Sequence, residues 1–260
     1  MSTNKSFTAQ DFASVLNQYN YNIHSGDIVA GTIFNQESQG FLVDIGANIA
    51  GYLPNEEIPY NLNQEEYHID FINETREFFI LAYNINSQQL LLSIKRLEYI
   101  RAWKRIKQLE AEDIVIQIPI HGTNKGGFIT KLEGIQGFIP KSHINLASID
   151  KNNNTIKCQL LIANEKNNKL IFSNKRALLQ IHKHRLKIGQ IIQGKIIKIQ
   201  TYGLFIQIYD IIALLHISEI GNTRIKYINK MFKINEIIKV KIIHIDMKQG
   251  RISVSHRNIN

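Results

Sequence analysis

The chain has 260 residues, of which 44% are hydrophobic and 20% charged, so it is not a disordered polar tract, and no apolar run reaches the length of a membrane span. Its formal net charge of +9 favours a polyanionic partner, such as nucleic acid or an acidic membrane surface. The charge is uneven: residues 1–96 carry a net −7, residues 97–176 a net +6 and residues 177–260 a net +10. This distribution predicts that the N-terminal third of the chain binds protein and that the rest binds phosphates.

The N-terminal segment, residues 1–22, is predicted to form an amphipathic helix, because Thr8 and Asp11 have the capping-box spacing and an apolar pattern follows. This helix must cover either the chain's own first domain or another protein, and the pattern leaves both open. The segment lacks a signal-peptide core, so we expect either that the protein acts in the compartment where it is made or that a targeting segment lies outside this sequence. The apolar face, a predicted docking surface, consists of Phe12, Val15, Leu16 and Tyr19.

Three segments of the chain repeat one pattern of short strands, with about 80 residues from one copy to the next. Each strand is rich in Ile, Val and Phe and is bounded by Gly, Asn or Asp. The first three strands of the copies are predicted at 26–34, 39–45 and 51–58, at 112–120, 126–132 and 137–144, and at 189–197, 202–208 and 213–220. The last two are predicted at 77–84 and 90–96, at 156–164 and 170–176, and at 237–246 and 251–257.

Five antiparallel strands in about 70 residues are typical of a small closed barrel of the oligonucleotide-binding (OB) fold. We therefore predict an all-β protein of three consecutive five-stranded OB-fold barrels, joined by short helical linkers and preceded by the N-terminal helix. The predicted domains are 23–96, 111–176 and 189–257, with a helical linker at 97–110 and a basic linker at 177–188. The apolar face of the first linker comprises Leu97, Ile100, Trp103, Ile106 and Leu109.

No group of residues in the sequence has the spacing of a catalytic site. GTNKGG at 122–127 resembles a phosphate-binding loop, but strand residues follow it where such a loop would open a helix. Cys158 is the single cysteine, which excludes an internal disulfide and fits a reducing compartment. His182 and His184 have no cysteine or carboxylate close by, so we expect neither a metal site nor a cofactor. An enzyme is the disfavoured hypothesis.

The third unit places aromatic and cationic residues where they can share one outer surface. Tyr202 and Phe205 are three apart across Gly203, and a bulge at this glycine would turn both rings the same way. His216 lies on the adjoining strand. Bases could then stack on the two rings, although periodicity alone leaves open that one or both belong to the core. The cations expected to contact the phosphates are Lys195, Lys198, Lys241 and Arg251.

The run YGLFIQIYDIIALLHISEI (202–220), closed by IDMKQGRISVSHR (245–257), resembles the RNA-binding domain named after ribosomal protein S1. That family's pattern is aromatic-Gly-x-Phe, then Gly/Ala-Leu-x-His-x-Ser-Glu, then Asp before Arg-x-x-Leu-Ser. The segments 7–34 and 175–196, with the Ala-Trp pair inside RAWKRI, extend the likeness to three-domain S1 proteins of cyanobacteria and plastids. The resemblance places the RNA-contacting positions of the family on Tyr202, Phe205, His216, Asp246 and Arg251.

The first two units depart from this family pattern. In the first unit the same positions hold Gln39, Leu42, Pro54 and Gln89, so we expect this domain to have lost its RNA-binding face. In the second unit they hold Gly126, Ile129, Pro140 and Lys169, and an aromatic residue, Phe128, is shifted by one position. We expect this domain to bind RNA weakly, mainly through the charges of Lys125, Lys131, Lys141 and Lys169.

The resemblance implies a non-enzymatic component of the small ribosomal subunit that captures single-stranded mRNA near the site of initiation. We expect a monomer within the ribosome, docked on a ribosomal protein through the N-terminal helix and acidic first domain, without a membrane partner. The alternatives are a free RNA chaperone or decay accessory and, less favoured, an RNA-processing enzyme. The composition predicts where the protein works. Frequent Ile, Asn and Lys indicate an AT-rich coding genome. Such a genome favours a plastid protein that is bound to ribosomes in the stroma over a protein in the cytoplasm of a cyanobacterium-like bacterium.

Overall fold

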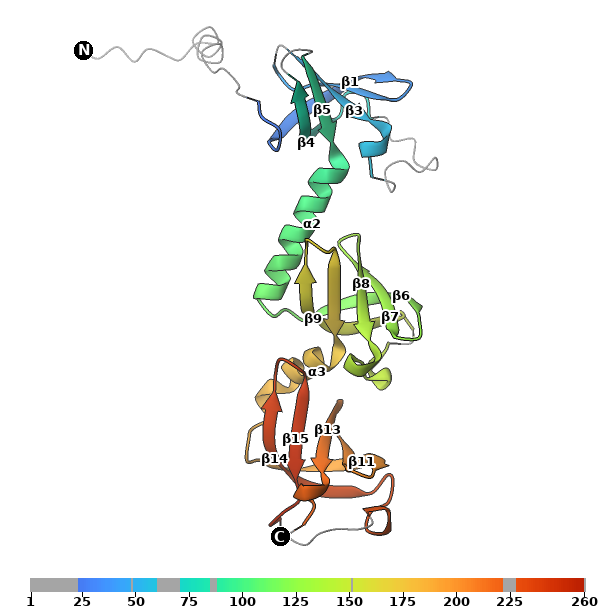
Figure 1. Cartoon of the computed structure of the whole chain (residues 1–260), viewed down its shortest axis with the longest axis vertical. Coiled ribbons are helices and arrows are strands. Elements are labelled where there is room, and N and C mark those ends of the chain that lie inside the picture. Colours follow the sequence, from blue (N-terminus) through green and yellow to red (C-terminus); the bar gives the residue numbers. More distant parts are fainter. Residues whose placement is uncertain are drawn as a thin grey trace, which may run out of the picture. The chain divides into compact units, whose positions relative to one another are not determined.

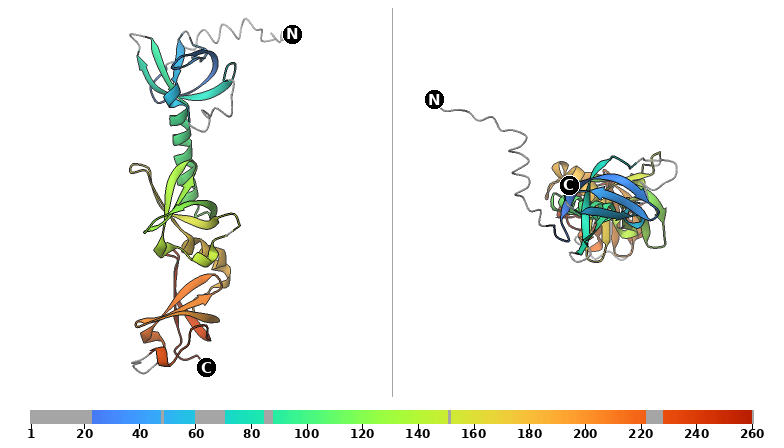
Figure 2. Two further views of the ribbon diagram at one scale, coloured as in Figure 1. Left: turned by 90° about the vertical axis from the view of Figure 1, so that its right-hand side faces the viewer. Right: turned by 90° about the horizontal axis from the view of Figure 1, so that it is seen from above.

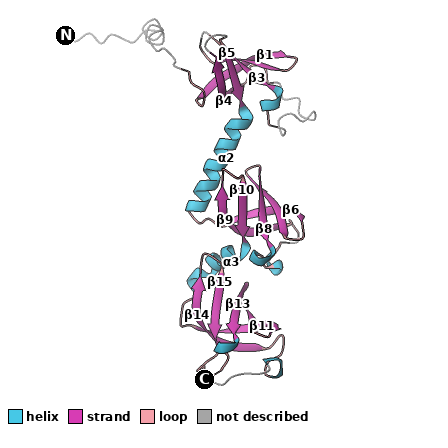
Figure 3. Ribbon diagram, viewed as in Figure 1, coloured by secondary structure: helices cyan, strands magenta, loops and turns pink. Residues whose placement is uncertain are grey.

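The computed structural model describes residues 23–47, 49–59, 71–84, 88–150, 152–221 and 228–259. The predicted N-terminal helix, with Phe12, Val15, Leu16 and Tyr19, lies outside the described residues. By its internal contacts the chain divides into two compact units, Met1–Arg101 and Ala102–Asn260. The first unit holds one β-barrel and the second holds two, and strands dominate throughout (Figures 1 and 3).

Three closed five-stranded barrels confirm the predicted all-β fold of OB type. In each barrel the third and fifth strands pair in parallel and the other neighbours are antiparallel, and the strands curve around a common interior (Figure 2). The first barrel comprises β1 (Ile28–Glu37), β2 (Gly40–Asp44), β3 (Ala50–Pro54), β4 (Thr75–Asn84) and β5 (Gln89–Ser93). The second comprises β6 (Ile116–Thr123), β7 (Gly127–Leu132), β8 (Ile135–Pro140), β9 (Thr155–Asn164) and β10 (Lys169–Ser173). The third comprises β11 (Ile191–Gln200), β12 (Gly203–Ile208), β13 (Ile211–His216), β14 (Ile237–Asp246) and β15 (Arg251–Ser255).

The first and fourth strands of each barrel carry a β-bulge at the same place. In the third barrel the register shifts between Ile196 and Lys198 in β11, and between Ile242 and His244 in β14. The other two barrels have matching shifts in their first and fourth strands. A bulge bends its strand and increases the local twist, which a short sheet needs in order to close on itself. Because the bulges match, outward positions correspond from one barrel to the next.

Aliphatic side chains fill the barrels, and residues from the helices complete two of the cores. In the third barrel Ile196, Leu204 and Val240 have no exposed surface, and Leu178 and Leu179 of the helix before this barrel join the same cluster. Ile94 joins the core of the first barrel in the same way. Burial of each such side chain stabilises the fold by about 1.5–3 kcal/mol relative to exposure. The helices are therefore part of the domains that they flank.

The two helices, α2 (Ile94–Ala111) and α3 (Asn174–His182), begin three residues before the predicted linkers, directly after the fifth strand of a barrel. A serine that ends each strand is the physical reason. The hydroxyl of Ser93 accepts the Arg96 N–H at 2.8 Å, and that of Ser173 accepts the Arg176 N–H at 3.2 Å, which is N-cap geometry. The short 3₁₀ turn Lys183–Arg185 then continues the second linker.

The predicted apolar face of α2 is largely buried. Within the second unit, Trp103, Ile106 and Leu109 are each at most 5% exposed, and the backbone N–H of Ala163 in β9 donates to the Glu110 carboxylate at 3.1 Å. Cys158 is buried in β9, and burial raises the pKa of its thiol, so the residue has the character of a core side chain. Neither described helix combines the length and apolar composition that crossing a membrane requires.

Candidate nucleic-acid interface

The rings of Tyr202 and Phe205 lie together on the outside of the third barrel. Tyr202 belongs to the turn before β12 and is 49% exposed, and Phe205 lies on β12 itself and is half-buried. Their centroids are 6.2 Å apart and the rings are nearly perpendicular. The predicted bulge at Gly203 is wrong, because Gly203 keeps regular register with Gln200 and His216. Tyr202 faces outward because it lies in the turn, where strand alternation no longer applies.

Strand register aligns Phe205 of β12 with one outward residue on each of the other four strands of the third barrel. Lys198 lies opposite Phe205, which lies opposite Leu214 on β13. Leu214 in turn lies beside Ser253 on β15, which lies opposite His244 on β14. We call these five positions the mid-barrel row. The row offers a ring between an ammonium and a leucine, with an imidazole at its far end. Its last three members, Leu214, Ser253 and His244, were not predicted from the sequence.

His216 and Arg251 lie on the same outer face as the row. His216 pairs with Gly203 next to Tyr202, and its Nδ1 accepts the Ser218 N–H at 3.3 Å, which leaves Nε2 as the donor of the neutral ring. Arg251 is exposed and lies opposite Asp246, one of whose carboxylate oxygens accepts the Gln249 N–H at 3.0 Å. Asp246 therefore shapes the turn that leads into Arg251.

The predicted phosphate-binding cations are all exposed. Lys195 lies opposite Gln207 in the barrel, and Lys241 lies opposite Ser255. Across the described part of the chain, neither these two nor Lys198 and Arg251 form an ion pair. Free ammonium and guanidinium groups around exposed rings are the combination that binds single-stranded nucleic acid, with bases on the rings and phosphates on the cations.

The charge of Arg251 acts through space on two further basic groups of the second unit, Lys175 and His143. Burial, followed by the positive charge of Arg251, lowers the pKa of the Lys175 ammonium. Burial, followed by the charges of Lys175 and Arg251, lowers the pKa of the His143 imidazole, whose Nδ1 lies 3.0 Å from the Ser173 hydroxyl. Burial is the larger cause of both shifts, and the smaller contribution of Arg251 indicates that its charge lies near Lys175, a grouping of positive charge that favours an anion.

The mid-barrel row has other side chains in the remaining two barrels. In the first barrel the central position of the row is Tyr52, and in the second it is Phe138, where the third barrel has Leu214. The full row of the first barrel is Asn35, Leu42, Tyr52, Leu91 and Ala82. The full row of the second is Gly122, Ile129, Phe138, Ile171 and Ile162. Neither row contains a charged residue.

The structure corrects the predicted position of Phe128. On β7 this residue lies on the same side as Thr130, which is completely buried, and opposite Ile139, which is also completely buried. Phe128 therefore lies on the interior side of β7, where it is half-buried, and Ile129 lies on the outward side. The alternation of inward and outward residues within GFITKL (127–132) indicates this orientation. The likeness of the segment to the aromatic-Gly motif had led to the opposite prediction. The predicted cations of this barrel, Lys125, Lys131, Lys141 and Lys169, are all exposed.

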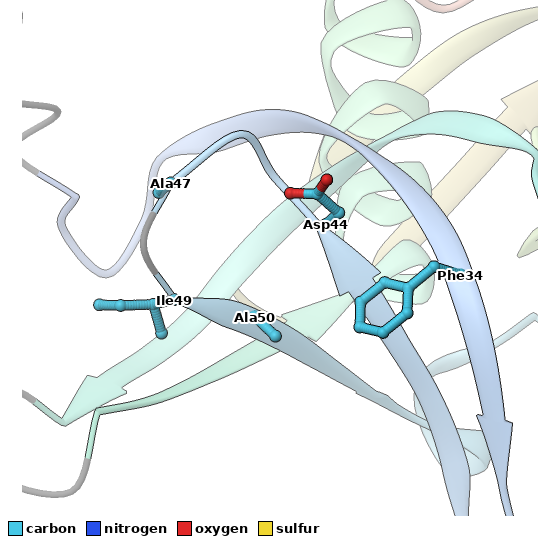
Figure 4. Close-up of a pocket in the computed structure, with 5 residues that line it drawn as sticks. All are labelled: Phe34, Asp44, Ala47, Ile49 and Ala50. Atoms are coloured by element: carbon cyan, nitrogen blue, oxygen red, sulfur yellow. The ribbon is translucent and has the colours of Figure 1, made fainter. Parts of the chain in front are cut away.

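The first barrel presents an exposed ring at a different place. Phe34, the bulged residue of β1, is 47% exposed and borders a pocket of about 330 Å³ (Figure 4). The Asp44 carboxylate at the end of β2 shares this pocket, and the remaining lining residues are Ala47, Ile49 and Ala50. A carboxylate beside an aromatic ring repels phosphate and attracts a cation. On the face of the first barrel that corresponds to the RNA-binding face of the third, the positions of the S1 pattern hold Gln39, Pro54 and Gln89, none of which is a cation.

Among the described residues, no three His, Cys, Asp or Glu side chains gather closely enough to hold a metal ion. Burial raises the pKa of the Cys158 thiol and lowers that of the His143 imidazole, and His143 Nδ1 lies beside the Ser173 hydroxyl. The exposed rings and cations of the third barrel are suited to binding through stacking and charge.

Comparison with known proteins gives two independent findings. The S1 RNA binding domain family matches residues 23–95 and 185–257, which contain the first and third barrels. Over 258 residues the chain is 50% identical to small ribosomal subunit protein bS1c of Porphyra purpurea, with 98% of both chains covered. It is 42% identical to bS1A of Synechocystis, covering 97% of this chain and 78% of the relative, and 34% identical to bS1c of Spinacia oleracea, covering 98% and 62%. The chain belongs to the bS1 family of ribosomal proteins, which it shares with these relatives through its S1 RNA-binding domains.

Proposed function

We propose that this chain is an RNA-binding component of the small ribosomal subunit that holds single-stranded mRNA for translation initiation. The observation that carries the proposal is the pair of exposed rings, Tyr202 and Phe205, 6.2 Å apart beside the Lys198 ammonium. The relatives from Porphyra purpurea, Synechocystis and Spinacia oleracea all bear the name of a small-subunit protein. Their distribution fits a plastid or cyanobacterial ribosome, as the sequence predicts.

RNA is held on the third barrel by stacking and by phosphate contacts. One base lies on each ring, and each stacked base contributes about 1–3 kcal/mol whatever its identity. The phosphates between them contact Lys198 and Arg251, and His216 donates from Nε2 to a phosphate or base edge. Because these contacts release counterions, affinity falls as salt rises. Such a surface retains many different messages, which suits a general translation component.

The first barrel docks the chain on a ribosomal protein. The first third of the sequence, which contains this barrel, is acidic, and the exposed Phe34 ring shares a pocket with the Asp44 carboxylate. A lysine or arginine side chain fits both groups, by cation–π contact with the ring and by charge with the carboxylate. Basic surfaces are frequent on proteins that contact ribosomal RNA. The predicted apolar face of the N-terminal helix adds to this contact.

The chain acts by binding and not by catalysis. Its relatives are ribosomal proteins, and its described barrels and helices present a stacking surface, cations and a docking pocket. RNA turnover would need a positioned general base or a metal at the RNA face, whereas stacking and phosphate contacts need neither.

Cosedimentation with small ribosomal subunits tests this proposal. The full chain should sediment with the subunits at moderate salt, and a chain shortened to residues 94–260, which keeps α2 whole, should not. Phe34→Ala with Asp44→Lys in the full chain should reduce cosedimentation without reducing RNA affinity. A full chain that binds RNA tightly but never sediments with subunits would favour a free RNA chaperone or decay accessory instead.

A further inference from the structure

The aromatic residue of the second barrel's mid-barrel row lies over a glycine pair. A Cβ atom added to Gly127 would lie 2.8 Å from Cζ of Phe138, and one added to Gly126 would lie 3.3 Å from the same atom. Gly126 and Gly127 occupy the sequence positions that Tyr202 and Gly203 hold in the third barrel. The ring of the second barrel therefore comes from the neighbouring strand and covers the place where the third barrel attaches its tyrosine.

Phe138 is flanked by apolar residues on both sides of its row. Ile129 lies opposite it on β7 and Ile171 beside it on β10, and Ile162, the next member of the row, is 41% exposed. Phe138 is only half-buried, so part of its ring meets solvent. An apolar strip with a ring at its centre can receive a flat aromatic base, because every base has an apolar face.

Cations border this strip in the second barrel and not in the first. Lys131 follows Ile129 by two residues on β7, and Lys169 precedes Ile171 by two residues on β10, so both share the outward side. The matching positions of the first barrel, relative to Leu42 and Leu91, are Asp44 and Gln89. Across the described part of the chain neither lysine forms an ion pair. The sign of the charge therefore distinguishes the two barrels, although both carry a central ring.

We infer that the second barrel holds its own RNA site, in which one base stacks on Phe138 and the adjoining phosphates contact Lys131 and Lys169. This inference rests on the proposed RNA-binding function and extends it to a barrel that lacks the aromatic positions of the S1 pattern. The first barrel has the same ring geometry, since a Cβ on Gly40 would lie 2.9 Å from Cζ of Tyr52. With Asp44 in place of a lysine, it repels the phosphates that the second barrel attracts.

A purely structural role for Phe138 would be to cover the glycine backbone. Leu214 holds the same row position in the third barrel and is half-buried there without a ring. Phe138→Leu therefore keeps an apolar cover of native type and removes only the flat surface. The comparison separates stacking from packing more cleanly than an alanine substitution, which would leave the glycine pair open to solvent.

The test uses the full chain carrying Tyr202→Ala and Phe205→Ala, so that the third barrel contributes little. Its affinity for an unstructured fluorescent oligonucleotide is measured by anisotropy at low salt, with and without Phe138→Leu. The added substitution should weaken binding by about 5- to 150-fold, the range that loss of one stacked base of 1–3 kcal/mol implies. Tyr52→Leu and Phe128→Leu in the same background are matched controls and should leave the affinity unchanged. Circular dichroism checks that each variant is folded.

Photo-crosslinking of the wild-type chain to an oligonucleotide with 4-thiouridine gives a second readout. Crosslinked peptides that include Phe138, beside those of the third barrel, support the inference. Unchanged affinity on Phe138→Leu, no residual binding in the double-alanine background, or crosslinks confined to the third barrel would each overturn it while the proposed function stands. A wild-type chain that does not bind the oligonucleotide at all contradicts the proposed function, and this site with it.

Discussion

Single residues decide which barrel can hold RNA. In the mid-barrel row, the third barrel has Lys198, Phe205 and His244 where the first has Asn35, Leu42 and Ala82. The backbone and the register are the same, so the difference in binding comes from the side chains alone. The presence of these residue types could be read from the sequence. Their common face could not, because it depends on bulges that shift the alternation in two strands.

Loss of both rings is the first prediction at this scale. Tyr202→Ala with Phe205→Ala should weaken binding of the full chain to an unstructured oligonucleotide by about 2–5 kcal/mol, because two stacked bases lose their support. Fluorescence anisotropy at fixed salt measures the change. Phe34→Ala removes an equally exposed ring from the acidic first barrel and should have no effect. Equal affinity of the double variant and the wild type would mean that the rings do not stack on RNA.

The cation at the end of the row should affect the salt dependence. Lys198→Ala removes one phosphate contact, so the slope of log affinity against log salt should become shallower by about 0.7. Affinity titrations between 50 and 300 mM salt give the slope. Lys104→Ala on the exposed side of α2 is the matched control. An unchanged slope for Lys198→Ala would show that this ammonium does not neutralise a phosphate.

His143 should make the stability of the second barrel depend on pH. Burial and the neighbouring charges of Lys175 and Arg251 lower its pKa in the folded chain, whereas the unfolded chain keeps a value of about 6.5. Its contribution is therefore fully present above pH 6.5 and is lost as the pH falls through the lowered folded value. Melting temperatures at pH 7.5 and 5.5 measure the loss, and His143→Asn should reduce the difference. An equal difference in both proteins would contradict this assignment.

At the scale of elements, the repeat predicted the barrels well because strand patterns and turn residues are local signals. In the described ranges, all fifteen strands fall within or next to the predicted segments, apart from shifts of a few residues at their ends. The helix starts were missed because the motifs SIKR and SNKR read as strand ends, although Ser93 and Ser173 cap helices there. Phe128 was misplaced for a related reason: a motif was weighed above the alternation of its own strand.

The capping serine gives a prediction for the first domain. Ser93→Ala removes the acceptor for the Arg96 N–H and the donor to the Glu57 carboxylate, so the domain should lose about 1–2 kcal/mol of stability. Urea unfolding followed by circular dichroism measures the loss. Ser38→Ala in the exposed β1–β2 turn should change stability by less than about 0.5 kcal/mol. Equal effects of the two substitutions would show that the cap does not hold α2 to its barrel.

For the whole molecule, charge and site quality change together along the chain. The acidic first third contains the barrel without a cationic face, and the most basic third contains the barrel with two exposed rings. Composition predicted this division of labour, because charge sums do not depend on three-dimensional contacts. The docking partner was not predictable, because a pocket such as that of Phe34 and Asp44 forms only when a bulge turns one ring outward.

Delivery of RNA to the ribosome tests the central claim most directly. Small subunits lacking their own bS1-family protein are mixed with the full chain and a labelled unstructured oligonucleotide, and both are followed through sedimentation. The wild-type chain should carry the oligonucleotide into the subunit fraction. The Tyr202→Ala, Phe205→Ala chain should sediment with the subunits and leave most of the oligonucleotide behind. A double variant that delivers as much oligonucleotide as the wild type would contradict the account.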